Sequence, residues 1–368
     1  MAEPLSVADP LAIIRRRMAA QRLVGDPFAT AAEAVAWSGG VQAQEYAEAL
    51  WSIGMRVRDA TAADVEAACD RDEILRTHVM RPTWHLVAAA DLRWLLRLTT
   101  PRIQAKNAGR YRQLGLDADT LRRSDETIAA TLADGEPRVR RELDAALVAA
   151  GIATAGQRIA HMVLHAELEA VIASGPRRGR HHTYLLLDGR VPPAPQRSRE
   201  EDVAELARRY FTSHGPATLR DFAWWSGLMI ADGRAGIEAL GEKLVGEADA
   251  DGRAWISAAT ATDDAPPPGD RGAFLLGTFD ELVVGHRDLR NVHADGRATN
   301  ALLPRPIVVD GLTVGGWTRR LARREVTIEA VLESPLNDPG NAALRAVADR
   351  FGDFVGLSAR LLSGAAQG

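Results

Sequence analysis

The sequence predicts a mainly α-helical protein with small β-hairpins, built from three similar units and a C-terminal α/β segment. The first observation is a repeat, because three helical segments followed by a short pair of strands occur three times along the chain. The second is the position of two proline-rich stretches, 192–195 and 263–268, which close the second and third copies as linkers. The third is length, since 368 residues exceed one ordinary core and predict two to four modules.

The first copy shows helical periodicity from its start. Apolar residues recur at helical spacing after Asp9 and Pro10, and Thr61 is a typical N-cap for a later helix. Two β-rich runs surround Arg81 and Pro82 and predict a hairpin. The expected elements are helices over about 11–18, 30–37, 46–53 and 62–70, and strands over 74–78 and 83–87.

The second and third copies repeat this order. In the third copy, Gly215 and Pro216 break one helix and Thr218 caps the next, which is typical of a helix-turn-helix. The second copy is expected to have helices near 124–133, 138–149 and 157–173 and a hairpin over 175–179 and 183–187. The third copy is expected to have helices over 200–213, 218–226 and 232–244 and a hairpin within 245–256.

The last hundred residues predict an α/β segment. We expect a strand over 273–276, a hairpin over 306–314 that turns at Asp310 and Gly311, and a final helix over about 341–350. Three helices followed by a hairpin, or wing, are typical of winged-helix modules, which normally hold DNA. The alternative is that any helix-rich chain can be divided into triplets. The expected boundaries are 1–118, 119–196 and 197–262 for three tandem winged-helix modules and 263–368 for the C-terminal segment.

The charge balance gives no global attraction to phosphate, because the net charge is −4 and the pI is near 6.2. A nucleic-acid face must therefore be local. Residues 285–324 contain eight arginines against three aspartates, and 176–182 form a second basic run. The alternative is that these arginines are spread over solvated surfaces.

Several classes of protein are disfavoured by the composition. No apolar run reaches the roughly 20 residues needed to cross a bilayer, and the N-terminus lacks a signal-peptide core, so a cytoplasmic location is expected. The single Cys69 excludes an intramolecular disulfide and a cysteine-rich metal site. His161 and His165 have a spacing that can bind metal, but no third ligand accompanies them, and no metal is expected. Only Lys106 and Lys243 could form a Schiff base.

The pair Gln42 and Gln44, just after Gly39 and Gly40, is the most informative motif. Glutamine cannot act as a general acid or base, but its amide can hold a water molecule. Residues two apart lie on one side of an extended segment and about 200° apart on a helix, so a shared water requires a non-helical connection. The alternative is that both glutamines merely cap or surface the following helix. Glu45 and Glu48, the nearest carboxylates, are interpreted as surface salt-bridge residues.

Five stretches of the chain resemble a known family. They are 41–44 (VQAQ), 81–87 (RPTWHLV), 214–227 (HGPATLRDFAWWSG), 279–288 (FDELVVGHRD) and 309–317 (VDGLTVGGW). In order and over nearly the whole chain, they resemble the winged-helix DNA glycosylase family of AlkZ and YcaQ. Its members remove bulky N-alkylated purines and unhook interstrand crosslinks. The AlkZ branch carries Gln-x-Gln, as here, and the YcaQ branch carries Gln-x-Asp.

The resemblance implies three winged helices in a C-shaped arrangement around a DNA-sized channel, with Gln42 and Gln44 as the catalytic pair. It also implies that a C-terminal hairpin, here 306–316, engages DNA near the lesion. The partner is then double-stranded DNA carrying alkylated purines, bound by a monomer without a cofactor. An N7-alkylated guanine is already cationic and leaves readily, so positioning water suffices. With neither lysine near the motif in sequence, a monofunctional glycosylase is expected.

Other residues are candidates for DNA contact. His85 in the first wing could touch a phosphate, but packing within the wing is the favoured alternative. It alternates with Trp84, and the tryptophan is expected to face the core. At least one of Trp224 and Trp225 is expected to be buried. The main alternative function is a non-catalytic winged-helix transcriptional regulator, and a third is sequestration of a small ligand. The DNA-contact candidates are His85, Arg177, Arg178, Arg287, Arg290, Arg305 and Arg319.

Overall fold

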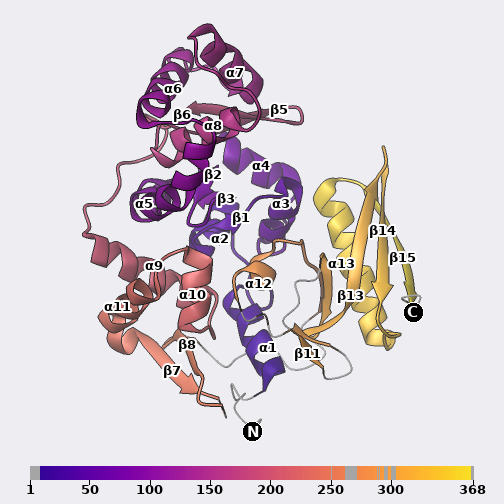
Figure 1. The fold of residues 1–368 in the computed structure, drawn as a ribbon. Helices are drawn as coiled ribbons and strands as arrows, with labels where there is room; N and C mark the ends of the chain where they lie inside the picture. The colour runs from indigo at the N-terminus through magenta and orange to yellow at the C-terminus, as the bar shows by residue number, and fades with distance from the viewer. Residues whose placement is uncertain are drawn as a thin grey trace.

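The computed structural model describes residues 9–249, 251–261, 272–287, 289, 291–293, 297–299 and 304–365. It is mainly α-helical with several small sheets, as predicted. Figure 1 shows the first unit at the centre, the second above it, the third at lower left and the C-terminal sheet at right. None of the helices in these ranges is long and apolar enough to cross a membrane.

The first unit follows the order helix, strand, two helices, two strands. Its three strands form an antiparallel sheet in the order β1-β3-β2, so the short β1 pairs with the second strand of the hairpin. The elements, with a helix before and after the unit, are α1 (Pro10–Ala20), α2 (Ala31–Ser38), β1 (Val41–Gln42), α3 (Tyr46–Gly54), α4 (Ala62–Asp70), β2 (Ile74–Val79), β3 (Thr83–Ala88) and α5 (Ala89–Gln113).

The second unit has the same order of elements and the same sheet order, β4-β6-β5. Its elements are α6 (Ala118–Thr131), β4 (Arg138–Val139), α7 (Arg140–Ala149), α8 (Arg158–Leu168), β5 (Ile172–Arg178) and β6 (His181–Leu186).

In the third unit, a single bridge between Ala217 and Ile256 takes the place of the short first strand of the other two units. Two longer strands pair as an antiparallel hairpin. The elements are α9 (Arg199–Ser213), α10 (Leu219–Ser226), α11 (Ile230–Leu240), the 3-10 helix η1 (Gly241–Lys243), β7 (Leu244–Ala248) and β8 (Ala254–Ala258).

The C-terminal segment is a five-stranded sheet in the order β15-β14-β13-β12-β9, antiparallel except for the parallel pair of β14 and β15. Helix α13 packs on it, and α12 lies between the first and third units (Figure 1). The elements are β9 (Ala273–Leu275), α12 (Glu281–Val284), β10 (Asn291–Val292), β11 (Ala298–Thr299), β12 (Pro306–Val309), β13 (Leu312–Leu321), β14 (Glu325–Leu332), α13 (Asp338–Val355) and β15 (Ser358–Ala365).

Local sequence signals explain most of these boundaries. Thr30, Thr61, Ser198 and Thr218 each form a capping box, in which the hydroxyl accepts from the N3 amide and the N3 carboxylate accepts in return. The predicted turn at Asp310 has a positive φ of 57°, as a tight hairpin requires. The helices and hairpins expected in the three units are therefore confirmed to within a few residues, apart from the ends of α6, α8 and α11.

Some expectations were wrong. Helix α5 is 25 residues long with Pro101 inside it, and no helix was expected there. Helix α8 ends at Leu168, five residues early, because Ile172 already belongs to a buried strand. Strands β14 and β15 were not expected. Strand β14 forms a local hairpin with β13, whereas the parallel pairing of β15 with β14 joins segments that are distant in sequence. The predicted linker over 263–268 and the boundary at 262 lie outside the described residues.

Hydrophobic cores cross the unit boundaries. One core joins the first unit to the C-terminal segment, where the rings of Trp51 and Phe351 meet edge-on with centroids 5.0 Å apart. A second joins the first hairpin and α5 to α9 and α10. A third lies mostly within the second unit. The first unit is thus held rigidly between the third unit and the C-terminal sheet, and its Gln-x-Gln segment lies at that junction.

Candidate active site

The Gln-x-Gln segment is non-helical, as a shared water requires. Gly39 ends α2 in the left-handed region with φ 74°, and Gly40 continues at φ 148°. The φ of 148° at Gly40 is one that L residues with a side chain rarely adopt, so the backbone conformation here favours glycine. The chain then enters β1, bends at Gln44 and starts α3. Gln42 is buried and Gln44 is exposed.

The Gln42 side chain is held by Arg81, from the turn between β2 and β3. Arg81 Nη2 donates to Gln42 Oε1 at 2.9 Å. Burial lowers the pKa of Arg81, and the charge of Glu281 opposes this shift. The side-chain oxygen of Gln42 therefore has one lone pair left to accept a further hydrogen bond. The side-chain nitrogen Nε2 of Gln42 has no partner among the described residues.

The backbone of the motif is held from both sides. The Ala43 amide donates to the Trp84 carbonyl at 2.7 Å, and Arg76 donates from Nε and Nη2 to the Ala43 carbonyl at 3.2 Å. The Arg76 guanidinium also lies 3.9 Å above the Trp84 ring. The peptide groups between the two glutamines are therefore fixed to the first hairpin.

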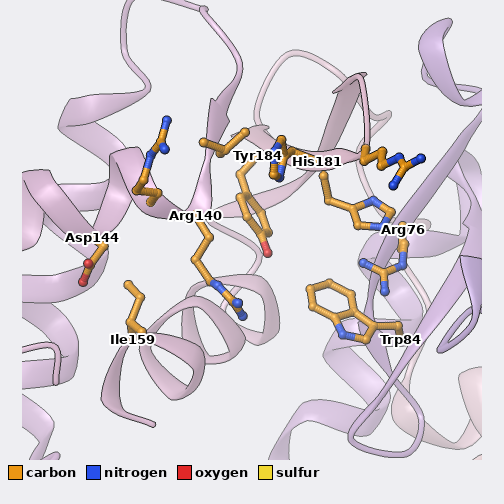
Figure 2. Close-up of a pocket in the computed structure, with 11 residues that line it drawn as sticks. Arg76, Trp84, Arg140, Asp144, Ile159, His181 and Tyr184 are labelled. Atoms are coloured by element: carbon orange, nitrogen blue, oxygen red, sulfur yellow. The ribbon is translucent and has the colours of Figure 1, made fainter. Parts of the chain in front are cut away.

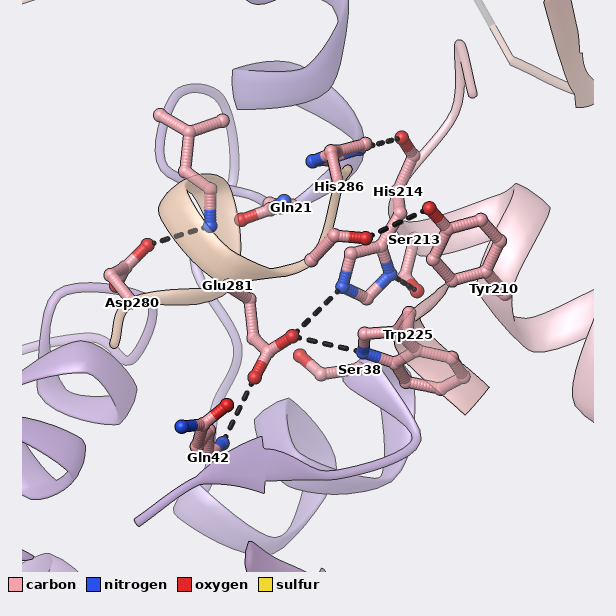
Figure 3. A network of polar contacts seen from close by, with 12 residues as sticks. Gln21, Ser38, Gln42, Tyr210, Ser213, His214, Trp225, Asp280, Glu281 and His286 are labelled. Atoms are coloured by element: carbon pink, nitrogen blue, oxygen red, sulfur yellow. Dashed lines mark hydrogen bonds and ion pairs between the residues drawn. The ribbon is translucent and has the colours of Figure 1, made fainter. Parts of the chain in front are cut away.

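A buried carboxylate joins the motif to the third unit. Glu281, in the first turn of α12, is 1% exposed. Its Oε1 accepts from the Gln42 amide at 2.9 Å, while Oε2 accepts from Trp225 Nε1 at 3.0 Å and lies 3.3 Å from His214 Nε2. Figure 3 shows these three contacts converging on Glu281, with the backbone amide of Gln42 facing it. The carboxylate thus connects β1, the end of α9, and α10.

The charge state of Glu281 follows from these partners. Burial raises the pKa of Glu281, but the hydrogen bond and charge of His214 and the bond from Gln42 outweigh it, so the pKa lies below its ordinary value. His286 donates from Nε2 to the His214 carbonyl at 2.9 Å, and burial and nearby Arg17 bring the pKa of His286 well below its ordinary value. Glu281 is therefore an ionised acceptor with both oxygens engaged.

His85 corrects a sequence prediction. It was a candidate for DNA contact, with packing within the wing as the favoured alternative, and it is fully buried and pairs across the sheet with Gln42, which agrees with packing. Its Nδ1 donates to the Thr83 carbonyl at 2.9 Å, and Nε2 has no partner among the described residues. Burial and then Arg81 lower the pKa of His85 to about 4. Trp84, expected to face the core, is instead partly exposed, because the pairing of β1 with β3 turns His85 inward.

Two of the predicted DNA-contact arginines in the second unit have acidic partners. Arg177 donates to Glu66 at 3.2 Å and lies 4.8 Å above the Tyr46 ring. Arg178 pairs with Glu142. Their positive charge is thus partly neutralised inside the protein, which weakens the prediction for both.

Arg305 and Arg319 converge on Glu48, in α3. Arg305 Nε donates to Glu48 Oε1 at 2.6 Å, and Arg319 Nη1 lies 3.9 Å from the same oxygen. Glu48 also accepts from the Thr278 amide at 2.8 Å and is only 3% exposed. The expected salt-bridge role of Glu48 is confirmed, but its expected place on the surface was wrong.

The remaining C-terminal candidates differ from one another. Arg287 is exposed, and Arg290 lies outside the described residues. The hairpin predicted to engage DNA has its turn packed on α1, where Arg15 Nε donates to the Asp310 carbonyl at 3.2 Å. A Cβ on the adjacent Gly311 would lie 3.1 Å from the Arg15 side chain. The turn of this hairpin therefore packs against α1.

A basic cavity of about 560 Å³ lies between the first hairpin and the second unit. Figure 2 shows Arg76 above Trp84 on one wall and Arg140 and Tyr184 on the other. One wall includes Arg180, His181 and His182 of the basic run 176–182, whereas the other wall, with Arg76 and Trp84, comes from a distant segment that sequence spacing could not place there. Exposed Arg140, Arg141 and Arg180 line it without a carboxylate partner among the described residues, alongside His181, His182, Val139, Asp144 and Ile159.

Sequence reasoning missed the buried acceptor of the site. Its neighbour Asp280 forms a buried ion pair with Arg56 at 2.9 Å. The signal that could have found Glu281 is its place in one of the five family-like stretches. Within the described ranges, no group of three or more metal-ligating side chains occurs, and His165 lies 2.9 Å from Asp125.

Comparisons with known proteins identify the family of this chain. A curated relative, the interstrand DNA cross-link repair glycosylase of Streptomyces sahachiroi, is 25% identical over 353 residues, which are 90% of this chain and 91% of that protein. The solved structure of Streptomyces sahachiroi DNA glycosylase AlkZ matches with a TM-score of 0.71 at 21% identity, over 96% of this chain and all of that one. A family model described as DNA glycosylase AlkZ-like matches residues 35–354. The chain therefore belongs to the AlkZ-like family of DNA glycosylases.

Proposed function

We propose that this protein is a monofunctional DNA glycosylase that hydrolyses the N-glycosidic bond of cationic, bulky N7-alkylguanine adducts and unhooks interstrand crosslinks. Gln42 and Gln44 position the attacking water. The observation that carries the proposal is the non-helical Gln-x-Gln segment, in which Arg81 and Glu281 hold Gln42 while Gln44 faces solvent. Family membership supports an enzyme over a non-catalytic regulator.

The surrounding groups favour water positioning over proton transfer. Glu281 has both oxygens occupied, and Glu48 is held by Arg305 and the Thr278 amide. The pKa of His85 is about 4, which makes it a weak base. A cationic purine leaves without being protonated by an acid. The remaining requirements are to position the attacking water and to stabilise the developing charge on the sugar, and oriented amide dipoles can meet both. Lys106 and Lys243 are both exposed, and neither contacts this network, which favours water over an imine.

The three units are proposed to be winged-helix modules with boundaries near 118, 196 and 262. The shared order of helix, strand, two helices and two strands supports this for the first two, and the bridge from Ala217 to Ile256 supports it for the third. They would hold double-stranded DNA carrying alkylated purines in a C-shaped arrangement, as a monomer.

The rate of base release is not expected to fall at acidic pH, as it would if a general base had to be deprotonated for catalysis. As the pH falls from about 7 to about 5.5, the single-turnover rate constant on an N7-methylguanine duplex should change by less than about threefold. The reason is that the pKa of Glu281 is lowered and that of His85 is about 4, so neither titrates in this window. A decline of about tenfold per pH unit would instead assign catalysis to a titrating base.

The arginines of the basic cavity are expected to bind the DNA backbone. Arg140→Ala and Arg180→Ala should each reduce the slope of log affinity against log salt concentration by about 0.9, for any duplex sequence. Arg122→Ala is the matched control, because Arg122 is already paired with Asp119 and Glu126 on α6. Salt titrations followed by fluorescence anisotropy measure the slope. Slopes equal to that of the wild type in all variants would show that the arginines of this cavity do not contact the DNA backbone.

The proposed function is tested on duplexes carrying one N7-alkylguanine or one interstrand crosslink between two guanine N7 atoms. The wild-type protein should release the free base or separate the strands, and the strand should break only after alkali. Direct nicking, or trapping of the protein on DNA by borohydride, would contradict the monofunctional water mechanism. Sequence-selective binding without base release from either substrate would instead favour the alternative function, a non-catalytic transcriptional regulator.

A further inference from the structure

Two adjacent tryptophans of α10 face opposite environments. Trp225 is fully buried and donates to Glu281, whereas Trp224 is 49% exposed. Eight large apolar side chains are exposed among the described residues, and Trp224, Met229 and Ile230 are three of them within seven residues of sequence. Apolar side chains gathered on a surface in this way usually mark a binding site.

This apolar group lies beside the Gln-x-Gln segment. The Arg81 guanidinium that holds Gln42 lies 5.4 Å from the Trp224 ring centroid. The end of α10 is tightly placed there, since a Cβ on Gly227 would come within 2.4 Å of the Met80 carbonyl oxygen. Arg81 thus contacts both the exposed indole and the catalytic candidate.

The flanking charges are basic. Arg102, Arg220 and Arg287 line the same open depression of about 700 Å³ as Trp224. All three are exposed, and in the described part of the chain none has an ion pair with a carboxylate. Asp232, which lies near Arg102, forms its own ion pair with Arg199 at 2.9 Å. An exposed aromatic ring flanked by arginines without ion pairs suits a polymeric ligand that carries both negative charges and planar groups.

We propose that Trp224, Met229, Ile230, Arg102, Arg220 and Arg287, together the Trp224 surface, bind the lesion-bearing DNA strand next to the reacting nucleotide. The indole stacks on an unpaired base or on a planar adduct, and the arginines contact the flanking phosphates. The inference depends on the proposed function only for its substrate, DNA with an adduct, and not on the glutamine chemistry. It makes Trp224 a specificity residue for bulky aromatic lesions.

The test measures binding, so that it does not depend on base release. Trp224→Ala and Trp224→Phe are made in the Gln42→Ala background, with Leu321→Ala as the control for another exposed apolar residue, on β13. Three labelled duplexes are compared by fluorescence anisotropy: unmodified, with N7-methylguanine, and with a planar aromatic N7 adduct. Melting temperatures of all variants confirm folding.

Trp224→Ala should weaken binding of the aromatic-adduct duplex about tenfold or more, and that of the unmodified duplex less, because stacking is lost. Trp224→Phe should recover most of the affinity, and Leu321→Ala should bind normally. Wild-type affinity of Trp224→Ala for all three duplexes would overturn the inference and point to a protein partner. If Trp224→Ala folds poorly, Arg220→Ala must lower the salt slope by about 0.9, and an unchanged slope would overturn the inference.

The two proposals fail separately. If the wild type releases no base but Trp224→Ala still weakens binding of the aromatic adduct, the surface stands and the enzymatic proposal fails. If the wild type releases bases but Trp224→Ala leaves affinity unchanged, only the Trp224 surface is wrong.

Discussion

Replacing Gln42 or Gln44 with alanine is expected to lower the single-turnover rate constant of base release by about 10²–10³-fold, comparable to removing one preorganised dipole from an enzyme site. The affinity for DNA should remain within about threefold, because neither amide is part of the basic surfaces. Gln44→Ala should leave stability unchanged, since that side chain is exposed. Gln42→Ala should also lower the melting temperature slightly, because Arg81 loses its acceptor.

Single-turnover quench experiments on N7-methylguanine duplexes measure the rate constants, and anisotropy gives affinity. Gln104→Ala is a matched control, because Gln104 is a glutamine on α5 that bonds to Glu169 away from the motif. Wild-type rates in both Gln42→Ala and Gln44→Ala would remove the glutamine pair from the mechanism. A rate loss explained wholly by weaker DNA binding would make the pair a binding element.

Removing the Glu281 carboxylate should have the largest effect on stability. Glu281→Ala leaves the Gln42 amide, the Trp225 indole and His214 without their buried acceptor, and breaking such a contact costs about 3–5 kcal/mol of unfolding free energy. Glu281→Gln keeps the shape and should cost less. Both variants should also slow base release, because the backbone of the motif loses its anchor.

The stabilisation by Glu281 depends on pH in a defined direction. Its folded pKa lies below the ordinary value of 4.5, so the contribution is complete above that pH and is lost as the pH falls through the folded pKa. Urea unfolding at about pH 7 and about pH 4 should therefore show a smaller gap between wild type and Glu281→Gln at the lower pH. Glu73→Gln, in an exposed pair with Arg71, is the control and should cost less than about 1 kcal/mol. Equal stability of Glu281→Ala and wild type would contradict the anchoring role.

Local chemistry made much of the fold predictable from sequence. Capping residues such as Thr61 and Thr218 act on amides within three residues, so they mark helix starts without tertiary information. The turn at Asp310 and Gly311 is similarly local. Gly39 and Gly40 correctly indicated that the Gln-x-Gln connection is not helical.

The remainder depended on contacts that sequence spacing cannot give. Glu281 lies 239 residues from Gln42, and several of the arginines expected on DNA were paired by carboxylates from other segments, as in Arg305 with Glu48. His85 is more deeply buried than Trp84, although the tryptophan was expected to face the core, because the burial of a two-faced strand is decided by what packs on each face. Strand β15 likewise pairs in parallel with β14 only across the intervening helix α13.

The most direct test of the central claim compares cationic and neutral lesions at one position of the same duplex. Wild-type protein is incubated with duplexes carrying N7-methylguanine, O6-methylguanine or hypoxanthine, and the free base is quantified. Water positioned by amides without an acid predicts release of the cationic base and no release of the two neutral ones. Comparable release of all three would contradict the mechanism, and release of none would contradict the proposed substrate class.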